Sequence, residues 1–322
     1  MKSKIFMKIL IGFGLFFIVL IIVFLSGPRV EIDTTIHPIN LPTDLDKYLE
    51  ESEAAFDDII PDTQKTIIWA GKPGVQTPLS VVFLHGFGGN RQMLSPLPET
   101  VAERLGANLF CTRLTGHGRN GDDMLDGSVN AWLNDTMEAI EIGRRLGKKV
   151  VLFGQSNGAN PATWLATQPV SENLDSLVLI SPCFDLADNR AHILLWPWGG
   201  QIAELLVGKE IYSKSPSEEF SKYSDDRYPT KALLPLMGMT KLVKSLNLSA
   251  INSPTLILYS PNDKVVSIDA VKDNFARIGA SHKKLVPYTK SKDPSQHGLA
   301  GRFAPESTED LAEIIVNFVR NK

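Results

Sequence analysis

Short runs of valine, isoleucine and leucine alternate with amphipathic helical patterns along most of the chain, and this alternation limits the possible folds more than any other feature. The runs are nearly continuous in apolar residues, which is typical of parallel strands that are buried on both faces. Strands and helices in this order predict a parallel sheet covered by helices on both sides. The expected strands are 66–70, 79–85, 108–114, 148–154, 174–182, 253–261 and 283–289, and the expected helices among them are 94–105, 130–147, 267–278 and 308–321.

The alternation breaks once, between Pro182 and Ser253. Connections in such folds usually have only a few residues, so this stretch is predicted to be a helical insertion, or cap, over residues 183–250. Its apolar segments, such as 193–200, either pack the cap onto the core or line a groove for acyl chains. The expected core is formed by residues 44–182 and 251–322.

The first 29 residues differ from the rest. Lys2, Lys4 and Lys8 precede an uncharged apolar run that ends at Leu25, and its length is at the short end of the roughly 17–25 residues that cross a bilayer as a helix. A cleaved signal peptide, which would release a secreted domain, is the alternative, but large residues stand where signal peptidase needs small ones. We expect residues 1–29 to be a transmembrane anchor. The lysines predict a cytoplasmic N-terminus and an extracytoplasmic catalytic domain.

A linker and one more helix are expected between the anchor and the sheet. Residues 30–43 contain Pro38 and Pro42 and show little periodicity, so they are predicted to be the linker. Thr43 is the expected N-cap of a helix that runs to about Ile59, with acidic residues on its outer face.

Composition excludes some functions. A formal net charge of −3 gives no basic surface for nucleic acid. The two cysteines, Cys111 and Cys183, do not form a metal-binding pattern. The glycines of segment 84–90 lack the lysine of a phosphate-binding loop. We therefore expect no metal and no cofactor.

The pentapeptide Gly154-Gln155-Ser156-Asn157-Gly158 lies between an expected strand and an expected helix. G-x-S-x-G in that position is typical of a nucleophilic serine on a strained turn, because side chains at the two glycine positions would collide where strand and helix meet. The turn would hold the Ser156 hydroxyl at the carboxyl edge of the sheet, where such folds bind ligands. Ser156 is our candidate nucleophile.

A serine nucleophile needs a base and an acid that orients the base. His297 follows the last expected strand and so lies at the same sheet edge as Ser156; it is our candidate base, with His282 second. Asp263, directly after the strand 253–261, is the candidate acid, and Asp185 is the alternative.

A tetrahedral intermediate also requires donors for its oxyanion. The backbone N–H of Asn157 lies at a helix N-terminus, and that of Phe87, in the loop after the strand 79–85, is positioned to join it. We expect these two amides to form the oxyanion hole.

These motifs resemble those of the α/β-hydrolase superfamily, in particular the group of monoglyceride lipases, lysophospholipases and bacterial carboxylesterases. The matching segments are 85–89, 116–118, 154–158, 262–266 and 297–298. The resemblance implies Ser156, Asp263 and His297 as a catalytic triad and a helical cap over the site. It also implies that two strands separate those near Cys111 and Cys183, so that both are free thiols. Asn157 and Ala159 replace the Met and Gly common in monoglyceride lipases, so the substrate is not carried over.

Three functions remain open from the sequence. The first is a membrane-tethered serine esterase or lipase that acts on a small-molecule or lipid ester through an acyl-enzyme. The second is a serine aminopeptidase or amidase, for which residues 224–228 offer acidic side chains to a substrate amine. The third is a non-catalytic binding protein with a hydrolase fold. The sequence gives no information on the oligomeric state.

Overall fold

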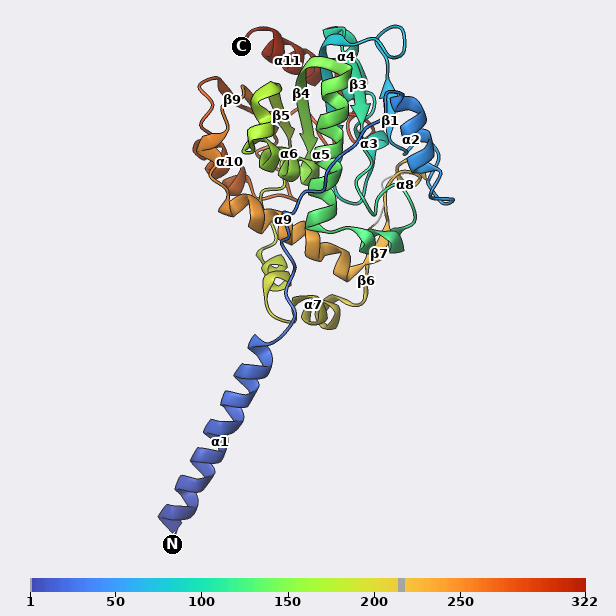
Figure 1. Cartoon of the computed structure of the whole chain (residues 1–322). Coiled ribbons are helices and arrows are strands. Elements are labelled where there is room, and N and C mark those ends of the chain that lie inside the picture. The colour runs from blue at the N-terminus through green and yellow to red at the C-terminus, as the bar shows by residue number, and fades with distance from the viewer. Residues whose placement is uncertain (1, 214–217) are drawn as a thin grey trace.

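In the computed structural model, which describes residues 2–213 and 218–322, a seven-stranded sheet forms the centre of the molecule (Figure 1). Its strand order is β1-β3-β2-β4-β5-β8-β9, and the six strands from β3 to β9 are parallel. Only β1 is antiparallel, and it pairs with β3. The strands are β1 (Thr66–Ile68), β2 (Thr77–Leu84), β3 (Asn108–Cys111), β4 (Gly147–Gln155), β5 (Leu174–Ile180), β8 (Thr255–Tyr259) and β9 (Lys283–Pro287).

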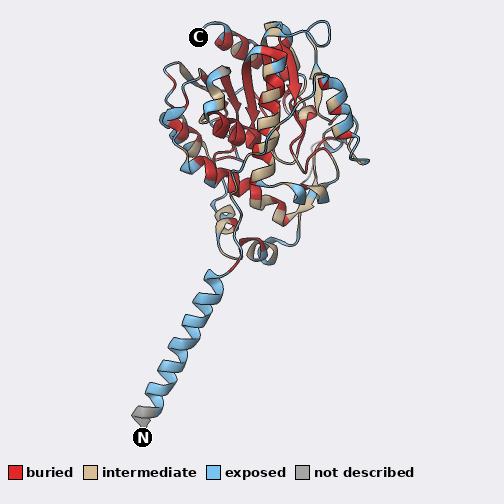
Figure 2. Cartoon of the chain, viewed as in Figure 1, coloured by how far each residue is buried: buried red, intermediate tan, exposed pale blue. Residues whose placement is uncertain are grey.

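Both faces of this sheet are covered, as the continuous apolar strands predict. In β4, Val150 and Leu152 face one core and Val151 and Phe153 face the other, and all four are fully buried. The first face is covered by α5 (Val129–Leu146), α6 (Ala159–Ala166) and α10 (Ile268–Arg277), and the second by α4 (Leu97–Leu105) and α11 (Thr308–Arg320). Figure 2 shows the buried strands between these layers.

The insertion after β5 is not wholly helical. It contains α7 (Gly199–Val207), α8 (Glu218–Ser221) and α9 (Leu233–Ser245), but also a hairpin of β6 (Glu210–Tyr212) and β7 (Arg227–Pro229). The hairpin pairs Ile211 with Tyr228, and an ion pair of 2.5 Å joins Arg227 to Glu210 across it. The predicted helical insertion is therefore wrong only for this hairpin, whose short strands are stabilised by such cross-strand side-chain pairs. Of the expected cap, residues 214–217 lie outside the described residues.

The N-terminal helix α1 (Lys2–Leu25) extends away from the body, and its residues from Ile5 onward are exposed (Figures 1 and 2). Its segment Ile5–Leu25 is long and apolar enough to cross a membrane. A signal sequence would have the same properties.

The expected linker is extended, and it is also attached to the body. Asn130 and Asn134 of α5 donate hydrogen bonds to the carbonyl of Thr35, at 2.8 and 3.0 Å, and Arg145 bonds to the carbonyls of Leu41 and Pro42. Residues 28–43 therefore form a strap along the molecule, which Figure 1 shows crossing α9 and α5.

The helix after the strap, α2 (Leu45–Glu53), begins and ends differently from the prediction. Its N-cap is Asp44, whose carboxylate accepts from the N–H of Lys47 at 3.0 Å, and not Thr43. The helix ends at Glu53, and Phe56 beyond it packs against the guanidinium groups of Arg113 and Arg119. Phe56 therefore lies outside the helix, which was predicted to run to about Ile59.

Both cysteines are free, as expected, and both are buried. The strands β2 and β4 lie between β3, which contains Cys111, and β5, which precedes Cys183. At about 4.8 Å per strand step the two thiols are too far apart for a disulfide.

Candidate active site

Ser156 is held in the strained turn that its flanking glycines predict. Its φ of +51° lies in the left-handed region, which is costly for a residue other than glycine. A Cβ on Gly154 would lie 2.7 Å from the Cα of Ala159, and one on Gly158 would lie 2.3 Å from the carbonyl oxygen of Leu84. The crowding of β4, α6 and the end of β2 therefore allows only glycine on each side of the serine.

Gly158→Ala is expected to destabilise this turn, since the new methyl group would collide with the carbonyls of Leu84 and His85. The loss of unfolding free energy should be about 1–3 kcal/mol, as for other overpacked sites. Urea unfolding of the variant measures it. Gly71→Ala is the matched control, because a Cβ there meets nothing within 4 Å; equal stability losses in both variants would contradict this account of the turn.

His297 and Asp263 meet Ser156 at the carboxyl edge of the sheet. The hydroxyl of Ser156 lies 2.9 Å from Nε2 of His297, and Nδ1 of His297 lies 2.8 Å from Oδ2 of Asp263. The side chain of Asp263 is completely buried, and its other oxygen accepts from the N–H groups of Val265 and Val266. Because an ionised carboxylate only accepts, Nδ1 of His297 carries the proton and Nε2 is free to accept the proton of the serine.

The loop that carries His297 is fixed by side chains that the sequence did not single out. The carboxylate of Asp293 accepts from the N–H groups of His297 and Gly298, both at 3.0 Å. The hydroxyl of Ser181, at the end of β5, donates to the carbonyl of His297 at 2.7 Å. The imidazole is thus oriented at its backbone as well as by Asp263. Nothing in the sequence pattern distinguishes Asp293 and Ser181 from ordinary loop residues.

The two alternative residues lie elsewhere. Asp185 contacts His192 in the cap, with Nε2 of His192 2.9 Å from its carboxylate, rather than His297. His282 precedes β9, so it lies at the amino edge of the parallel sheet, and its ring packs on Phe318. Neither residue joins the group around Ser156.

The loop after β2 lies against the serine turn. A Cβ on Gly86 would lie 3.0 Å from that of Ser156, and the N–H of Gly86 donates to Oε1 of Gln155 at 3.0 Å. The N–H of the next residue, Phe87, takes no acceptor among the described residues. Asn157 lies in the first turn after Ser156, where helical N–H groups lack helical partners. Both candidate oxyanion donors therefore belong to segments that meet at the serine.

The ring of His85 also holds the loop after β2 in place. Its Nδ1–H donates to the carbonyl of Gly86 at 2.9 Å, and its Nε2 accepts from the N–H of Leu114 at 3.0 Å. Burial lowers the pKa of His85 to about 3, so the ring is neutral and can fill both roles. His85 is thus a structural support for the loop, in keeping with its complete burial.

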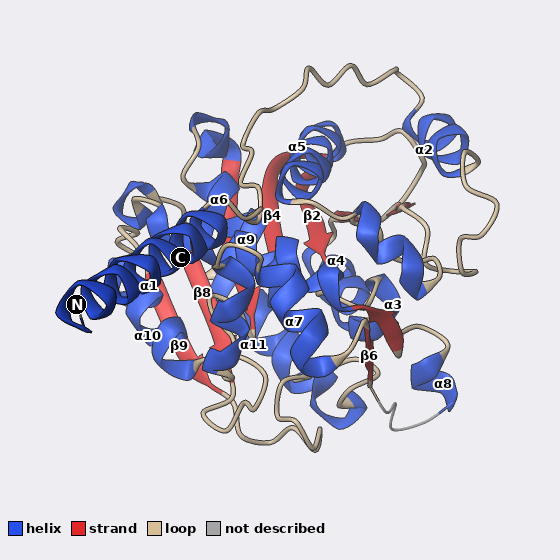
Figure 3. Ribbon diagram, turned by 90° about the horizontal axis from the view of Figure 1, so that it is seen from below, coloured by secondary structure: helices blue, strands red, loops and turns tan. Residues whose placement is uncertain are grey.

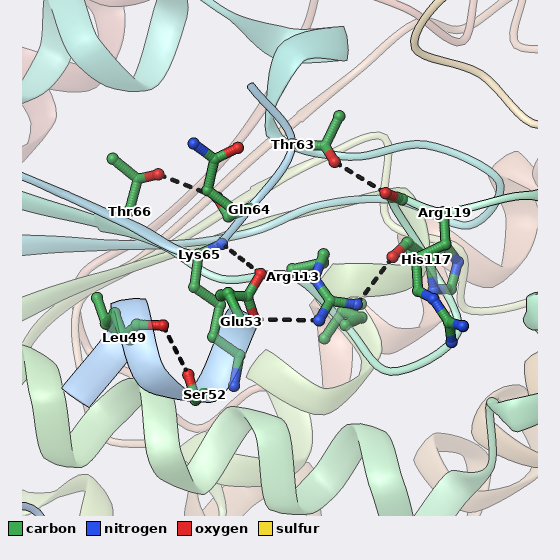
Figure 4. Close-up of polar contacts among 12 residues, drawn as sticks. Leu49, Ser52, Glu53, Thr63, Gln64, Lys65, Thr66, Arg113, His117 and Arg119 are labelled. Atoms are coloured by element: carbon green, nitrogen blue, oxygen red, sulfur yellow. Dashed lines mark hydrogen bonds and ion pairs between the residues drawn. The ribbon is translucent and has the colours of Figure 1, made fainter. Parts of the chain in front are cut away.

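An ion pair between Arg113 and Glu53 joins the loop after β3 to the end of α2 (Figure 4). Nε and Nη2 of Arg113 contact the two oxygens of Glu53, the last residue of α2, at 2.8 and 3.0 Å, and Nη1 donates to the carbonyl of His117. The ring of His117 packs edge-on against Phe87, with 5.8 Å between centroids. A chain of contacts therefore runs from α2 to the candidate oxyanion loop, and no sequence motif indicates it.

A cavity of about 560 Å³ opens beside Ser156. Its wall combines the loop after β2, the cap and the loop of His297, and most of its side chains are apolar. They include Phe87, Met93, Leu186, Phe220, Leu233, Leu236, Val265 and Phe303.

Two acidic residues of the cap, Asp225 and Asp226, also line this cavity. Asp225 donates its N–H to the carbonyl of Gly88 at 2.9 Å, so the cap is joined to the candidate oxyanion loop. Burial raises the pKa of the Asp225 carboxyl to about 7, and the neighbouring carboxylates of Asp226 and Asp123 add to this effect. Asp225 therefore changes its charge near neutral pH, inside the cavity.

A mostly parallel sheet with this serine turn and this cap defines an α/β hydrolase. Residues 76–292 match the Hydrolase_4 family, described as serine aminopeptidase, S33, and the chain belongs to that family. Its group within the superfamily is the one of monoglyceride lipases and esterases. The expected resemblance is thereby confirmed.

Individual relatives agree with this assignment. A thermostable monoacylglycerol lipase of Bacillus sp. (strain H-257) is 26% identical over 211 residues, which are 65% of this chain and 80% of that enzyme. The structure of a metagenome-derived lipolytic enzyme superposes with a TM-score of 0.68 at 21% identity, over 82% of this chain and all of that one. A soluble variant of the Saccharomyces cerevisiae monoglyceride lipase gives a TM-score of 0.62 at 14% identity, over 80% and 90% of the two chains. At these identities the structural matches establish the fold.

Proposed function

We propose that the protein is a membrane-anchored serine hydrolase that cleaves carboxylic esters with an apolar acyl chain. The observation that carries the proposal is the chain of hydrogen bonds from Ser156 through His297 to Asp263, at the wall of a largely apolar cavity. The similarity to lipases and esterases supports the same substrate class.

In the proposed reaction the hydroxyl of Ser156 attacks the ester carbonyl while Nε2 of His297 takes its proton. The buried carboxylate of Asp263 stabilises the imidazolium that forms. The N–H groups of Phe87 and Asn157 donate to the oxyanion, and each such donor is typically worth about 2.7–4 kcal/mol of transition-state stabilisation. His297 then protonates the leaving alcohol. In the second half His297 takes a proton from a water molecule that attacks the acyl-enzyme, and returns it to the Ser156 oxygen as the carboxylic acid leaves.

A panel of p-nitrophenyl esters of increasing acyl length tests the substrate class, with aminoacyl p-nitroanilides as the comparison. The full-length protein in detergent micelles should hydrolyse the esters and prefer acyl chains long enough to contact the apolar cavity wall. Faster cleavage of the anilides than of every ester would reject the proposal.

Asp225 gives the aminopeptidase alternative its specific support, because a cavity carboxylate could bind a substrate ammonium group. A hydrogen bond to a charged group contributes about 1.5–3 kcal/mol. If amines were the substrates, Asp225→Asn would lower kcat/KM for aminoacyl anilides by about 10- to 150-fold. If neutral esters are the substrates, as we propose, the same change should not lower kcat/KM for ester hydrolysis.

Asp225 also predicts a pH effect on ester binding. The carboxyl is neutral below its pKa of about 7 and charged above it, and a charge beside an apolar acyl chain disfavours binding. KM for a neutral long-chain ester should therefore rise as the pH increases through 7 in the wild type. Steady-state kinetics of Asp225→Asn, which retains His297, provide the control; a parallel rise in that variant would show that another group is responsible.

We further propose that α1 crosses the membrane with its N-terminus in the cytoplasm, so that residues 30–322 lie on the other side. The three lysines before the apolar run, against Arg29 alone just after it, support this orientation. On this proposal residues 44–182 and 251–322 form the catalytic domain and 183–250 its cap. Intact mass measurement of the membrane-purified protein tests the anchor, because loss of the first residues would reveal a cleaved signal peptide.

A further inference from the structure

The cap has an apolar surface beside the point where α1 joins the body. The last three residues of α7 are the most exposed part of it: Leu205 is 85% exposed, Leu206 63% and Val207 61%, and Trp196 just before α7 is 52% exposed. Helices on a protein surface normally turn polar residues outward. In α7 the only charged residue, Glu204, instead forms an ion pair of 3.0 Å with Lys231 of the cap.

Trp198 attaches the start of α7 to the end of α1. Its backbone N–H donates to the carbonyl of Pro28 at 2.9 Å, and its indole Nε1–H donates to the carbonyl of Val23 at 3.0 Å. Gly27 packs so closely on the indole that a Cβ there would lie 2.1 Å from its Cδ1. This group of contacts among Val23, Gly27, Pro28 and Trp198 is called the α1–α7 joint below.

The α1–α7 joint sets the depth of α7 relative to a bilayer. Val23 lies within the apolar segment Ile5–Leu25, so if α1 crosses a membrane the indole of Trp198 lies at its surface, where tryptophan is enriched. The nine residues of α7 span about 13 Å from that point at 1.5 Å per residue. The exposed end of α7 therefore remains close to the membrane surface, and Figures 1 and 3 show α7 on the side of the body from which α1 projects.

The strap keeps the body in this orientation. Its contacts with α5 begin a few residues after the joint, and the side chain of Val30 lies close to Gly238 of α9. A body that is held at both the joint and the strap cannot turn freely about the end of α1.

We infer that the end of α7, with Leu205, Leu206, Val207 and Trp196, embeds in the leaflet that surrounds the outer end of α1, so that the cap is a second membrane contact. The inference rests on the membrane anchoring proposed above. Lipid covers this apolar surface, because the α1–α7 joint holds it at the membrane surface, where the proposed transmembrane segment of α1 ends. Shallow insertion of apolar side chains from a helix that lies in the interface is a common way to bind bilayers.

The contact has a consequence for the substrate. α7 packs on the first turn of α9 and on the segment before it: a Cβ on Gly200 would lie 3.1 Å from Leu234 and 3.4 Å from Lys231. The neighbouring Leu233 and Leu236 line the cavity. A lipid ester in that leaflet is then close to the cap wall of the site, without first passing through water.

The test uses the full chain with a fluorescent NBD group on Leu206→Cys, reconstituted into phosphatidylethanolamine–phosphatidylglycerol vesicles. The native Cys111 and Cys183 are buried, but Cys183 lines the cavity, so the wild-type protein treated with the same reagent gives the background signal. We expect blue-shifted emission that lipids with brominated acyl chains quench. The control is Val75→Cys, an exposed position before β2, at the sheet edge opposite the site; its emission should be neither shifted nor quenched.

Two failures can be told apart by extracting the same vesicles with alkaline carbonate. If the protein stays in the membrane but the label at position 206 is not quenched, the α7 contact is wrong and the anchor remains. If carbonate releases the protein, the anchoring proposal itself fails. If the emission is blue-shifted but brominated lipids do not quench it, and cross-linking yields dimers, a second copy of the chain covers α7. That result overturns the inference.

Activity provides an independent readout. Leu205→Gln combined with Leu206→Gln should lower hydrolysis of a long-chain ester embedded in the vesicles severalfold. It should leave hydrolysis of a water-soluble short-chain ester unchanged, because neither residue lines the cavity. Equal effects on both substrates would contradict a role at the membrane.

Discussion

Replacing His297 by alanine is expected to lower kcat for ester hydrolysis by about 10⁴- to 10⁶-fold, the range seen when the base of a serine triad is removed. The reason is geometric: Nε2 of His297 lies 2.9 Å from the hydroxyl of Ser156, and in the candidate site no other imidazole contacts that hydroxyl among the described residues. Without the base, the serine keeps its proton at neutral pH. Initial rates with a p-nitrophenyl ester at saturating concentration measure the loss.

His282→Ala is the matched control for this prediction. That ring packs against Phe318 away from Ser156, so kcat should stay close to the wild-type value. Asp185→Asn serves the same purpose for the acid, since Asp185 bonds to His192 and not to His297. A large loss in His282→Ala, or a small one in His297→Ala, would mean that the base has been misassigned.

Replacing Glu53 by leucine should lower the free energy of unfolding by about 3–5 kcal/mol, because it leaves a buried guanidinium without its partner. The side chains of Arg113 and Glu53 are only 4% and 10% exposed, and they form two hydrogen bonds. The N–H of Lys65 also donates to the same carboxylate. Equilibrium unfolding in urea, followed by circular dichroism, provides the measurement.

The double variant Glu53→Leu, Arg113→Met tests the physical reason. Removing both charges removes the desolvation penalty as well, so the double variant should be more stable than Glu53→Leu alone. Simple addition of the two single losses would contradict the buried-pair explanation. Slower ester hydrolysis in folded Glu53→Leu would show in addition that the contacts from Arg113 through His117 to Phe87 position the candidate oxyanion loop.

The fold was predictable because its pattern is local. Continuous apolar strands such as Val150–Phe153 can be buried only between two helical layers, and the predicted strands and helices match the observed ones to within a few residues. Prediction and structure differ where a contact with a side chain far away in the sequence determines the end of a strand or helix. The strand predicted over 108–114 ends at Cys111, beyond which Arg113 turns toward Glu53, and the helix predicted to Ile59 ends at Glu53.

The candidate site was predictable to the extent that its residues carry a motif. Ser156 is marked by Gly154 and Gly158, and Asp263 and His297 by their places after strands that end at the same edge. Asp293, Ser181 and Glu53 act through contacts between segments far apart in the sequence, and no spacing reveals such contacts. The attachment of the strap to α5 was missed for the same reason, because the asparagines that hold it resemble any polar residues on a helix surface.

The most direct test of the proposed mechanism is to treat the full-length protein with a fluorophosphonate and locate the adduct by peptide mass spectrometry. This reagent phosphonylates a serine that has been activated by a base, so the account predicts a single adduct on Ser156. Ser156→Ala and His297→Ala should both abolish labelling. Folded wild-type protein that remains unlabelled, or an adduct on another residue, would contradict the account; the former would favour a hydrolase fold that serves binding alone.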